Sequence, residues 1–325
     1  MPNHDILLLM HKPEAGHFVR VYAPGGIGNI GPGLDILGCA LTGAGDTVEL
    51  RWRSESCSDL VHVEDPGDPA LPHNPGRHTA AIAALAVLRA SGISPSRCLT
   101  MRVRKELPLA GGQGGSAASA VAGAVAANTL LGNPLDQRML LLAALEAESA
   151  VAGRHADNIA PALLGGIVLV RSVEPLDVVQ LPCPPALHVA LVYPRQHLRT
   201  ADSRAVLPAS VDRAVAVQQC ANVGALVWAF ASGDLALLGR ALDDAIAEPA
   251  RAPLLPGFAA AKAAALGAGA LGCSISGAGP SSFAFAEDDA SAEEIARAMV
   301  EAYETNGVSA RSRIARIDER GARVV

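Results

Sequence analysis

The residues with the clearest chemical potential lie in a glycine-rich segment, 108–119 (PLAGGQGGSAAS), which ends in hydroxyl and small side chains. Glycine adopts backbone angles closed to other residues and lets a ligand approach the main chain. A helix that begins near Ser116 would direct its free N–H groups and positive dipole end at this loop. The segment therefore predicts an anion cradle, best suited to phosphate. The alternative is a flexible linker before a core helix.

The spacing of the glycines narrows the type of phosphate site. No Lys follows them, which excludes a Walker loop, and the pattern differs from the GxGxxG of dinucleotide folds.

A second polar cluster comprises His155, Asp157 and Asn158, in a loop expected between a helix and a strand. Functional side chains often gather in such loops. We expect these residues to hydrogen bond a small polar substrate. Metal binding by His155 and Asp157, or helix capping by Asp157, are the alternatives.

A third stretch, 24–35 (PGGIGNIGPGLD), offers Asn29 and Asp35 within a glycine- and proline-rich loop. The backbone of such a loop can press against a ligand while the two side chains make directed contacts. The alternative is a turn-rich crossover in which Asn and Asp satisfy their own backbone.

The elements that would position these residues follow from the apolar pattern. The alternating strand 99–104 leads directly into the glycine segment, and a helix of small residues follows, which is the order that a phosphate cradle needs. A second helix, 135–151, carries Glu146 and Glu148 near its C-terminal end, where acidic groups oppose the helix dipole. A metal ion bound nearby would make such a carboxylate useful, whereas a surface position would make it a small cost.

The remaining pattern predicts a two-part chain with a boundary in the segment 174–185, giving units 1–175 and 176–325. In the first unit we expect strands at 18–23, 46–53 and 167–171, an exposed loop at 64–78 and a helix at 79–90. The second unit reads β-α-α-α-β-β-α-β, which is typical of an α+β sandwich with helices on one sheet face. Its elements are expected at 187–193, 212–232, 235–247, 258–266, 272–285 (two strands), 292–305 and 311–317, with a turn at 249–253.

Composition limits the class of protein. The formal net charge is -6 and no basic block stands out, so a nucleic-acid partner is not expected. The 6 cysteines are scattered and predict reduced thiols of a cytoplasmic protein. The apolar run at 6–10, within a loosely held N-terminal extension, is too short for a signal peptide, and no uninterrupted apolar window reaches membrane-span length.

The glycine stretches near 24–38, 108–119 and 272–285 together resemble the three motifs of the GHMP small-molecule kinases. Within that superfamily the likeness is greatest to the homoserine kinases. APGGIGNIGPGLDILGCAL resembles their A-P-A-S-x-A-N-L-G-x-G-F-D-x-L-G-x-A-L, and HADNIAPALLGG resembles H-x-D-N-x-A-P-x-x-x-G-G. EPLDV, TADSRAVLP and EPARAPLLP match in order, so that the resemblance covers residues 18–325.

This resemblance implies a two-domain GHMP kinase fold of the α+β class, with a ribosomal-protein-S5-like N-terminal domain and a ferredoxin-like C-terminal domain. It implies ATP- and Mg²⁺-dependent phosphorylation of the side-chain hydroxyl of L-homoserine, for threonine biosynthesis, by a cytoplasmic homodimer. A GHMP kinase for another small hydroxy compound and a non-catalytic amino-acid sensor on the same fold are the alternatives.

The resemblance also implies roles for individual residues. Ser116 and Glu148 would hold Mg²⁺, and Asp157 and Asn158 would act in catalysis, with Asn158 orienting the attacking hydroxyl. The homoserine contacts would be Asn29, Asp35, His155, Asp157, Arg204 and Arg251. The phosphates would lie on Pro108, Gly111, Gly112, Gln113, Gly114, Gly115, Ser116, Ala117, Ala118 and Ser119.

Several positions depart from the family pattern. Gln113 stands where Leu is usual, Ala278 where Ser is usual, and His78 where an Asn beside the adenine pocket is common. Glycines replace other small residues at positions 25, 26, 28, 111 and 115. None of these changes removes a charged group assigned to substrate or metal, so we expect an active enzyme with weaker nucleotide binding.

Overall fold

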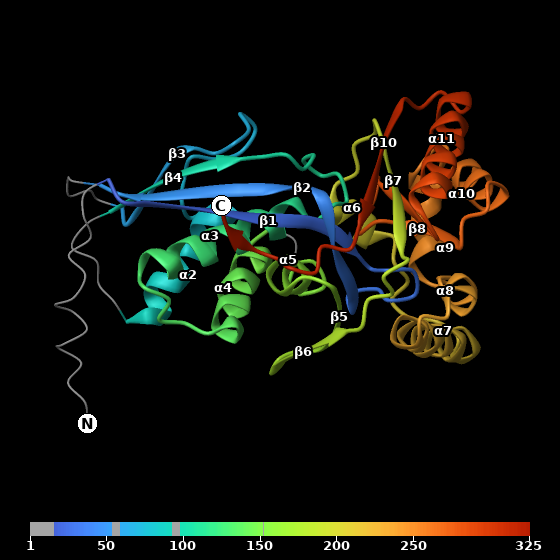
Figure 1. The fold of residues 1–325 in the computed structure, drawn as a ribbon, viewed down its shortest axis with the longest axis horizontal. Helices are drawn as coiled ribbons and strands as arrows, with labels where there is room; N and C mark the ends of the chain where they lie inside the picture. The colour runs from blue at the N-terminus through green and yellow to red at the C-terminus, as the bar shows by residue number, and fades with distance from the viewer. Residues whose placement is uncertain (1–15, 54–58, 93–97, 152) are drawn as a thin grey trace.

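Two sheets, each packed against helices, form the body of the protein (Figure 1). The computed structural model describes residues 16–53, 59–92, 98–151 and 153–325. Predictions made for the N-terminal extension and for Cys57 lie outside these residues.

The first sheet has seven strands in the order β11-β1-β2-β4-β3, with β5 on the free part of β2 and β6 on β5. Pairing is antiparallel except between β3 and β4. Its strands are β1 (Phe18–Gly28), β2 (Leu37–Trp52), β3 (Val61–Asp65), β4 (Leu99–Arg104), β5 (Ile167–Val173), β6 (Leu176–Leu181) and β11 (Arg323–Val324). β1 continues beyond the predicted strand through the glycines to Gly28, because its backbone there pairs with the start of β2.

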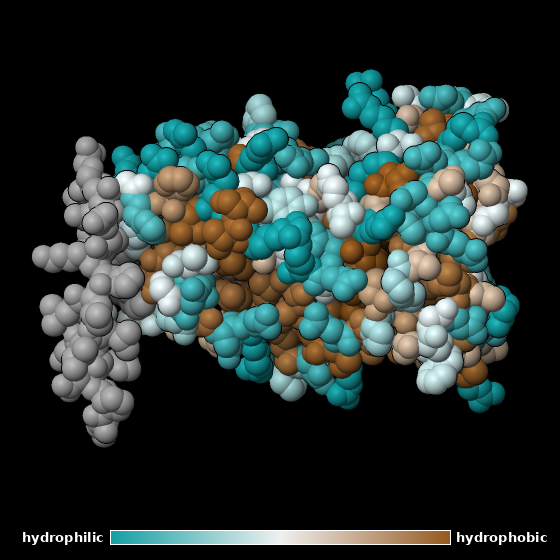
Figure 2. All heavy atoms as spheres, viewed as in Figure 1, coloured by the Kyte–Doolittle hydropathy of each residue, from teal (hydrophilic) through white to brown (hydrophobic). Residues whose placement is uncertain are grey.

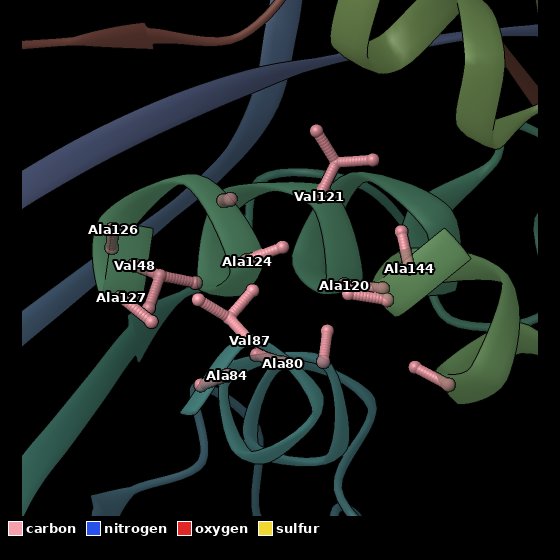
Figure 3. Close-up of a cluster of buried hydrophobic side chains, with 14 of the residues drawn as sticks. Val48, Ala80, Ala84, Val87, Ala120, Val121, Ala124, Ala126, Ala127 and Ala144 are labelled. Atoms are coloured by element: carbon pink, nitrogen blue, oxygen red, sulfur yellow. The ribbon is translucent and has the colours of Figure 1, made fainter. Parts of the chain in front are cut away.

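Helices of small residues cover this sheet. They are α2 (Thr79–Ser91), α3 (Gly115–Leu130), α4 (Gln137–Ser149) and the short α5 (Ile159–Leu164). Figure 3 shows Ala80, Ala84 and Val87 of α2 facing Ala120 and Ala124 of α3, while Val121 points away from α2. A Cβ at Gly123 of α3 would collide with the carbonyl oxygen of Ala80, so α2 and α3 touch through their backbones. In Figure 2, hydrophobic atoms reach the surface over this helix layer, whereas the strand edge above it is mostly hydrophilic.

The second sheet has four antiparallel strands in the order β10-β7-β9-β8. They are β7 (His188–Pro194), β8 (Gly272–Ile275), β9 (Ser282–Ala286) and β10 (Ala310–Arg316). The helices of this part are α6 (Thr200–Ala205), α7 (Arg213–Ser232), α8 (Leu235–Ala241), α9 (Ala247–Arg251), α10 (Phe258–Gly267) and α11 (Asp289–Thr305), with a 3-10 turn at Ala252–Leu254. The predicted α+β class is confirmed.

Helices lie on both faces of the second sheet, so the prediction of one covered face is wrong. Val189 and Leu191 of β7 join a core with Phe230 of α7, whereas Ala190 and Val192 join a core with residues of α10 and α11. Alternate strand residues point to opposite faces, and both sets here are apolar.

Two local predictions also differ from the structure. The helix expected at 235–247 ends at Ala241, since the Asp244 carboxylate accepts hydrogen bonds from the N–H groups of Ile246, Ala247 and Glu248 and begins α9. The turn expected at 249–253 therefore contains the end of a helix. The boundary at residues 175/176 stays a prediction; β6 and β11 lie after it in sequence and pair within the first sheet.

The cysteine prediction holds only in part. Cys39, Cys183, Cys220 and Cys273 are free thiols, but Cys98 is disulfide-bonded. Spacing along the sequence does not determine which thiols a fold brings together, which is why the pattern was misread at Cys98.

Among the described helices, α7 is long and apolar enough to cross a membrane when judged by length and composition alone. Its average hydropathy is high enough for a span, but polar residues interrupt it, so it is not an uninterrupted apolar run. A single such helix is weak evidence for a membrane span.

Candidate active site

The glycine segment is the turn between β4 and α3, as predicted. Gly112 and Gly114 have φ angles of 73° and 69°, which glycine adopts without strain. The helix starts at Gly115, and Gly114 provides no side-chain cap for its first N–H groups. The start of α3 therefore offers unpaired backbone donors and the positive dipole end to an anion.

The turn between β8 and β9, in the second sheet, hydrogen bonds directly to this loop. The hydroxyls of Ser276 and Ser281 donate to the carbonyl oxygens of Gly112 and Gly111 at 2.7 and 2.6 Å. The side chain of Gln113 also enters this contact, where its Nε2 donates to Ser281 Oγ at 3.3 Å. The two distant glycine turns thus meet directly, and Gln113 points into the seam between them.

Ser116 and Glu148 lie together beside the loop. Ser116 Oγ donates to Glu148 Oε2 at 2.9 Å, although α3 and α4 hold the two residues on different helices. Burial raises the pKa of the Glu148 carboxyl to about 7. Glu146, by contrast, is exposed and pairs with Arg89.

This pair suits Mg²⁺ better than a metal held by protein alone. No group of three or more His, Cys, Asp or Glu side chains among the described residues could hold a metal ion. Mg²⁺ commonly binds one or two carboxylates and completes its shell with phosphate oxygens and water. One carboxylate and one hydroxyl beside a phosphate cradle fit that pattern, whereas the alternative of a metal on His155 and Asp157 has no such support.

Asp157 is buried at the end of β1. The backbone N–H of Asn29 donates to Asp157 Oδ2 at 3.1 Å, and Asn158 Nδ2 donates to the same oxygen at 3.3 Å. Burial, with the nearby Asp35 charge, raises the pKa of the Asp157 carboxyl to about 6. A Cβ at Gly28 would collide with Asp157 and Asn158, so glycine makes room for both side chains there.

Asp35 joins residues from three separate segments. Arg204 Nη1 and Nη2, from α6, donate to its two carboxylate oxygens at 3.2 and 2.8 Å. His155 Nδ1 lies 3.2 Å from Asp35 Oδ1, and burial lowers the pKa of this imidazole. Asn29 Oδ1 accepts from the Asp35 N–H at 2.7 Å and so holds the turn closed.

Arg251 is the most deeply buried cation of the group, with a relative exposure of 2%. Its Nη1 donates to the Gly277 carbonyl oxygen at 3.0 Å and its Nε to that of Ser203 at 3.3 Å. Its Nη2 has no hydrogen-bond partner within the described part of the chain. Burial lowers the pKa of this guanidinium, and a carboxylate would offset that cost.

One cavity of about 600 Å³ unites these features. Of the residues singled out from the sequence, it is lined by Asn29, Pro108, Gly111, Gly112, Gly114, Gly115, Ser116, Ser119, Glu148, His155, Asp157, Asn158, Arg204 and Arg251. Four others do not line it: Asp35, Gln113, Ala117 and Ala118. Ser116 and Asp157 therefore face one space.

Sequence reasoning missed Lys105. This buried lysine pairs with Asp46 and donates to the Gly115 carbonyl oxygen at 2.9 Å and to Ser119 Oγ at 3.0 Å. Ser119 in turn donates to Asp46 Oδ2 at 2.7 Å. This network holds the first turn of α3 in place through Gly115 and Ser119. A charged residue three positions before Pro108 was the only sequence signal for it.

Comparisons with known proteins show the family of the chain. Residues 78–166 match the GHMP kinases N terminal domain, and residues 226–305 match the GHMP kinases C terminal family. The chain is 44% identical over 300 residues to a homoserine kinase of Chlorobium phaeobacteroides, covering 89% of this chain and 93% of that protein. It is 43% identical over 313 residues to a homoserine kinase of Arabidopsis thaliana, covering 94% of this chain and 84% of that one.

Solved structures give the same result. A homoserine kinase from Cytophaga hutchinsonii superposes with a TM-score of 0.91 at 39% identity, covering 98% of this chain and 100% of that one. The mevalonate kinase of L. major has a TM-score of 0.74 at 17% identity, a likeness that shows the fold alone.

Proposed function

The chain belongs to the homoserine kinases of the GHMP kinase superfamily, and from this premise we propose that it phosphorylates L-homoserine with ATP. The γ-phosphoryl group passes to the side-chain hydroxyl, giving O-phospho-L-homoserine for threonine biosynthesis. The observation that supports the proposal is one cavity lined by the glycine turn, the start of α3 and a cluster of charged side chains.

The phosphate end of the cavity binds through the main chain. The triphosphate lies on the N–H groups at the start of α3, where the N-cap residue, Gly114, has no side chain to occupy them. Lys105 supports this turn through Gly115 and Ser119 rather than by replacing the Walker lysine. Phosphoryl transfer gains most from alignment and charge stabilisation, which such a preorganised loop supplies.

Ser116 and Glu148 would hold Mg²⁺. When bound, the ion neutralises negative charge on the phosphates. The raised pKa of Glu148 fits this role, because a buried carboxylate without a cation is disfavoured in its charged form.

The other end of the cavity would bind the amino acid. Asp157, beside Asn29 and Asp35, provides negative charge for the ammonium group, while Arg251 and Arg204 provide forked cations for the carboxylate. Asp35 acts behind the cavity wall by holding Arg204 and His155. Asn158, which donates a hydrogen bond to Asp157, would orient the attacking hydroxyl.

Asp157 lines the cavity next to Asn158, so we infer that it lies near the acceptor hydroxyl of the substrate. With a pKa of about 6 it is mostly ionised at neutral pH and can accept a hydrogen bond from the substrate. A weak base is sufficient here, because the leaving group is already activated by its position and charge environment.

The remaining parts of the proposal come from the family: a homodimer in the cytoplasm, with no nucleic-acid or membrane partner. The relatives at 42 to 44% identity favour homoserine over another small hydroxy compound. The paired Ser116 and Glu148 disfavour a non-catalytic sensor, which needs no metal.

A turnover assay tests the function. Purified protein with ATP and Mg²⁺ is supplied with L-homoserine, L-serine, L-threonine or mevalonate, and ADP release is followed. Release with homoserine alone is the expected result. Turnover of mevalonate would assign the protein to another GHMP activity, and binding without turnover of any compound would favour the sensor.

A further inference from the structure

The outer face of α7 is apolar and faces solvent. Val217 and Trp228 are 63% and 64% exposed. They belong to a stripe in which successive members are four, three, four and three residues apart, and every member is exposed: Val217, Ala221, Gly224, Trp228 and Ala231. This spacing is that of a helix seam that packs against another helix.

The opposite face of α7 is fixed to the protein. Gln219 donates to the Pro32 carbonyl oxygen and to Asp244 Oδ1 at 2.9 and 2.8 Å, and Asn222 donates to the Asp243 carbonyl oxygen at 2.9 Å. Leu226 and Phe230 are buried in the core beneath the helix. Insertion of α7 into a membrane would break all these contacts. Docking on a lipid surface would call for a basic polar face, whereas Arg213 is the sole cation in the helix.

Gly224, at the centre of the stripe, has no intramolecular reason to be glycine. A Cβ there would meet nothing within 4 Å, and φ is not in the left-handed region. Glycine in a helix interior costs about 1 kcal/mol relative to alanine. Small residues on a helix surface allow a second helix to approach closely.

The stripe is self-complementary when two copies of α7 run antiparallel about a two-fold axis at Gly224. Val217 then lies opposite Ala231 of the partner subunit, and Cys220, an exposed small residue next to the stripe, lies opposite the partner subunit's Trp228. Large side chains thus face small ones along the seam. A two-fold contact uses the same patch on both copies, as this pattern requires.

The charges at the ends of the helix agree with the same pairing. Arg213 begins α7, and Asp234 follows its last residue, Ser232, by two positions. Antiparallel pairing brings each Arg213 beside Asp234 of the partner subunit and sets the two helix dipoles head to tail. Parallel pairing would instead place like ends of the two helix dipoles together.

We propose that the outer face of α7 is the contact between two copies of this chain, paired antiparallel across Gly224. The inference deepens the homodimer of the preceding proposal and names its surface, and it does not depend on the identity of the phosphorylated substrate.

Sedimentation of the full chain gives the first test. We expect a dimer for the unaltered protein and a monomer for Val217→Glu/Trp228→Glu, because the pair would place four carboxylates in one apolar seam. Leu266→Glu is the matched control, since Leu266 is an exposed apolar residue of α10. It should leave the dimer intact. Circular dichroism verifies that each variant is folded.

Disulfide trapping tests the register in a protein whose surface is otherwise intact. In a Cys220→Ser background, Gly224→Cys should link two chains under mild oxidation, because the two-fold axis brings both copies of position 224 together. Val217→Cys alone should not, since its two copies lie about 20 Å apart along the helices and a disulfide spans at most about 7 Å between Cα atoms. Val217→Cys with Ala231→Cys should link again.

The outcomes separate the surface from the homodimer. A dimer that survives the two glutamates and gives no link at position 224 would overturn the α7 contact while the homodimer stands. If the unaltered chain is a monomer, both the homodimer and the α7 contact are wrong. A monomer that sediments with phosphatidylserine vesicles would replace the second copy with a lipid surface.

Discussion

The two ends of the cavity are built in different ways. The phosphate end is one continuous piece of chain, β4, its glycine turn and α3, and it presents backbone N–H groups. The amino-acid end collects side chains from the turn after β1, from α6 and α9 and from the segment before α5, and it presents charges. The first should therefore be sensitive to changes in backbone geometry, and the second to the loss of single charged atoms.

The charges are also balanced differently. At the amino-acid end Asp35 and Arg204 form an ion pair, and the buried Asp157 and Arg251 add one group of each charge. At the phosphate end the Ser116 hydroxyl is the one hydrogen-bond partner of the Glu148 carboxylate among the described residues, and burial raises the pKa of this carboxyl to about 7. That end is complete only with a cation.

The largest expected effect is at the amino-acid end. Asp157→Ala should abolish homoserine phosphorylation, with turnover lower by about 10²- to 10⁴-fold, while the Kd for ATP stays nearly constant because the glycine turn is untouched. Steady-state kinetics and calorimetric titration with ATP would measure the two. Unchanged turnover would remove Asp157 from catalysis, and Asp157→Asn controls for the shape of the side chain.

The second largest expected effect concerns Mg²⁺ binding at the phosphate end. Glu148→Gln should slow turnover and raise the Mg²⁺ concentration for half-maximal rate by about 10- to 100-fold, since losing a charged partner costs about 1.5–3 kcal/mol. In the unaltered enzyme the Mg²⁺ requirement should rise as pH falls below about 7, where Glu148 becomes protonated. Normal metal kinetics in the variant would exclude Glu148 as a ligand.

Replacing the guanidinium of Arg251 should have a smaller effect. Arg251→Lys keeps the charge but loses the planar fork, so we expect the KM for homoserine to rise about tenfold, for a loss of about 1.4 kcal/mol. Arg199→Lys is a matched control, because Arg199 pairs with Asp202 on the surface at 70% side-chain exposure. An equal rise in both variants would mean that neither contacts the substrate.

Within the glycine turn, backbone geometry should matter more than side chains. Gly112→Ala should raise the KM for ATP by up to about tenfold, because φ of 73° costs alanine about 1–2 kcal/mol and its Cβ would lie 2.5 Å from the Ser276 carbonyl oxygen. Gln113→Leu should change it by less than about fivefold, since its side chain bonds Ser281 and Arg313 outside the cavity and one such bond is worth about 1 kcal/mol. The reverse order would show that the phosphates are held by side chains.

The smallest expected effect concerns stability without ligands. The pKa of Glu148 is raised from 4.5 to about 7, so the unfolded state holds its charge more readily and stability is lost as pH rises from about 4.5 through about 7. Glu148→Gln should therefore raise the Tm by several degrees at pH 8, for at most about 3 kcal/mol, and by much less near pH 4.5. Calorimetry at both values checks this, and a gain independent of pH would contradict it.

The sequence by itself determined the phosphate turn, the α+β class and the family. Glycine conformations and helix starts depend on neighbouring residues, so 108–119 could be interpreted from its own residues. HADNIAPALLGG likewise carried the resemblance in one unbroken segment.

Only the tertiary structure decided which side chains meet. Asp35 and Arg204 pair across 169 positions, Gln113 turns away from the cavity toward Ser281, and Cys98 enters a disulfide. Lys105 becomes a support of the phosphate turn only because β2 brings Asp46 beneath it. Such contacts arise from the packing of distant elements, whose distances and directions are not encoded in the local pattern of any one segment.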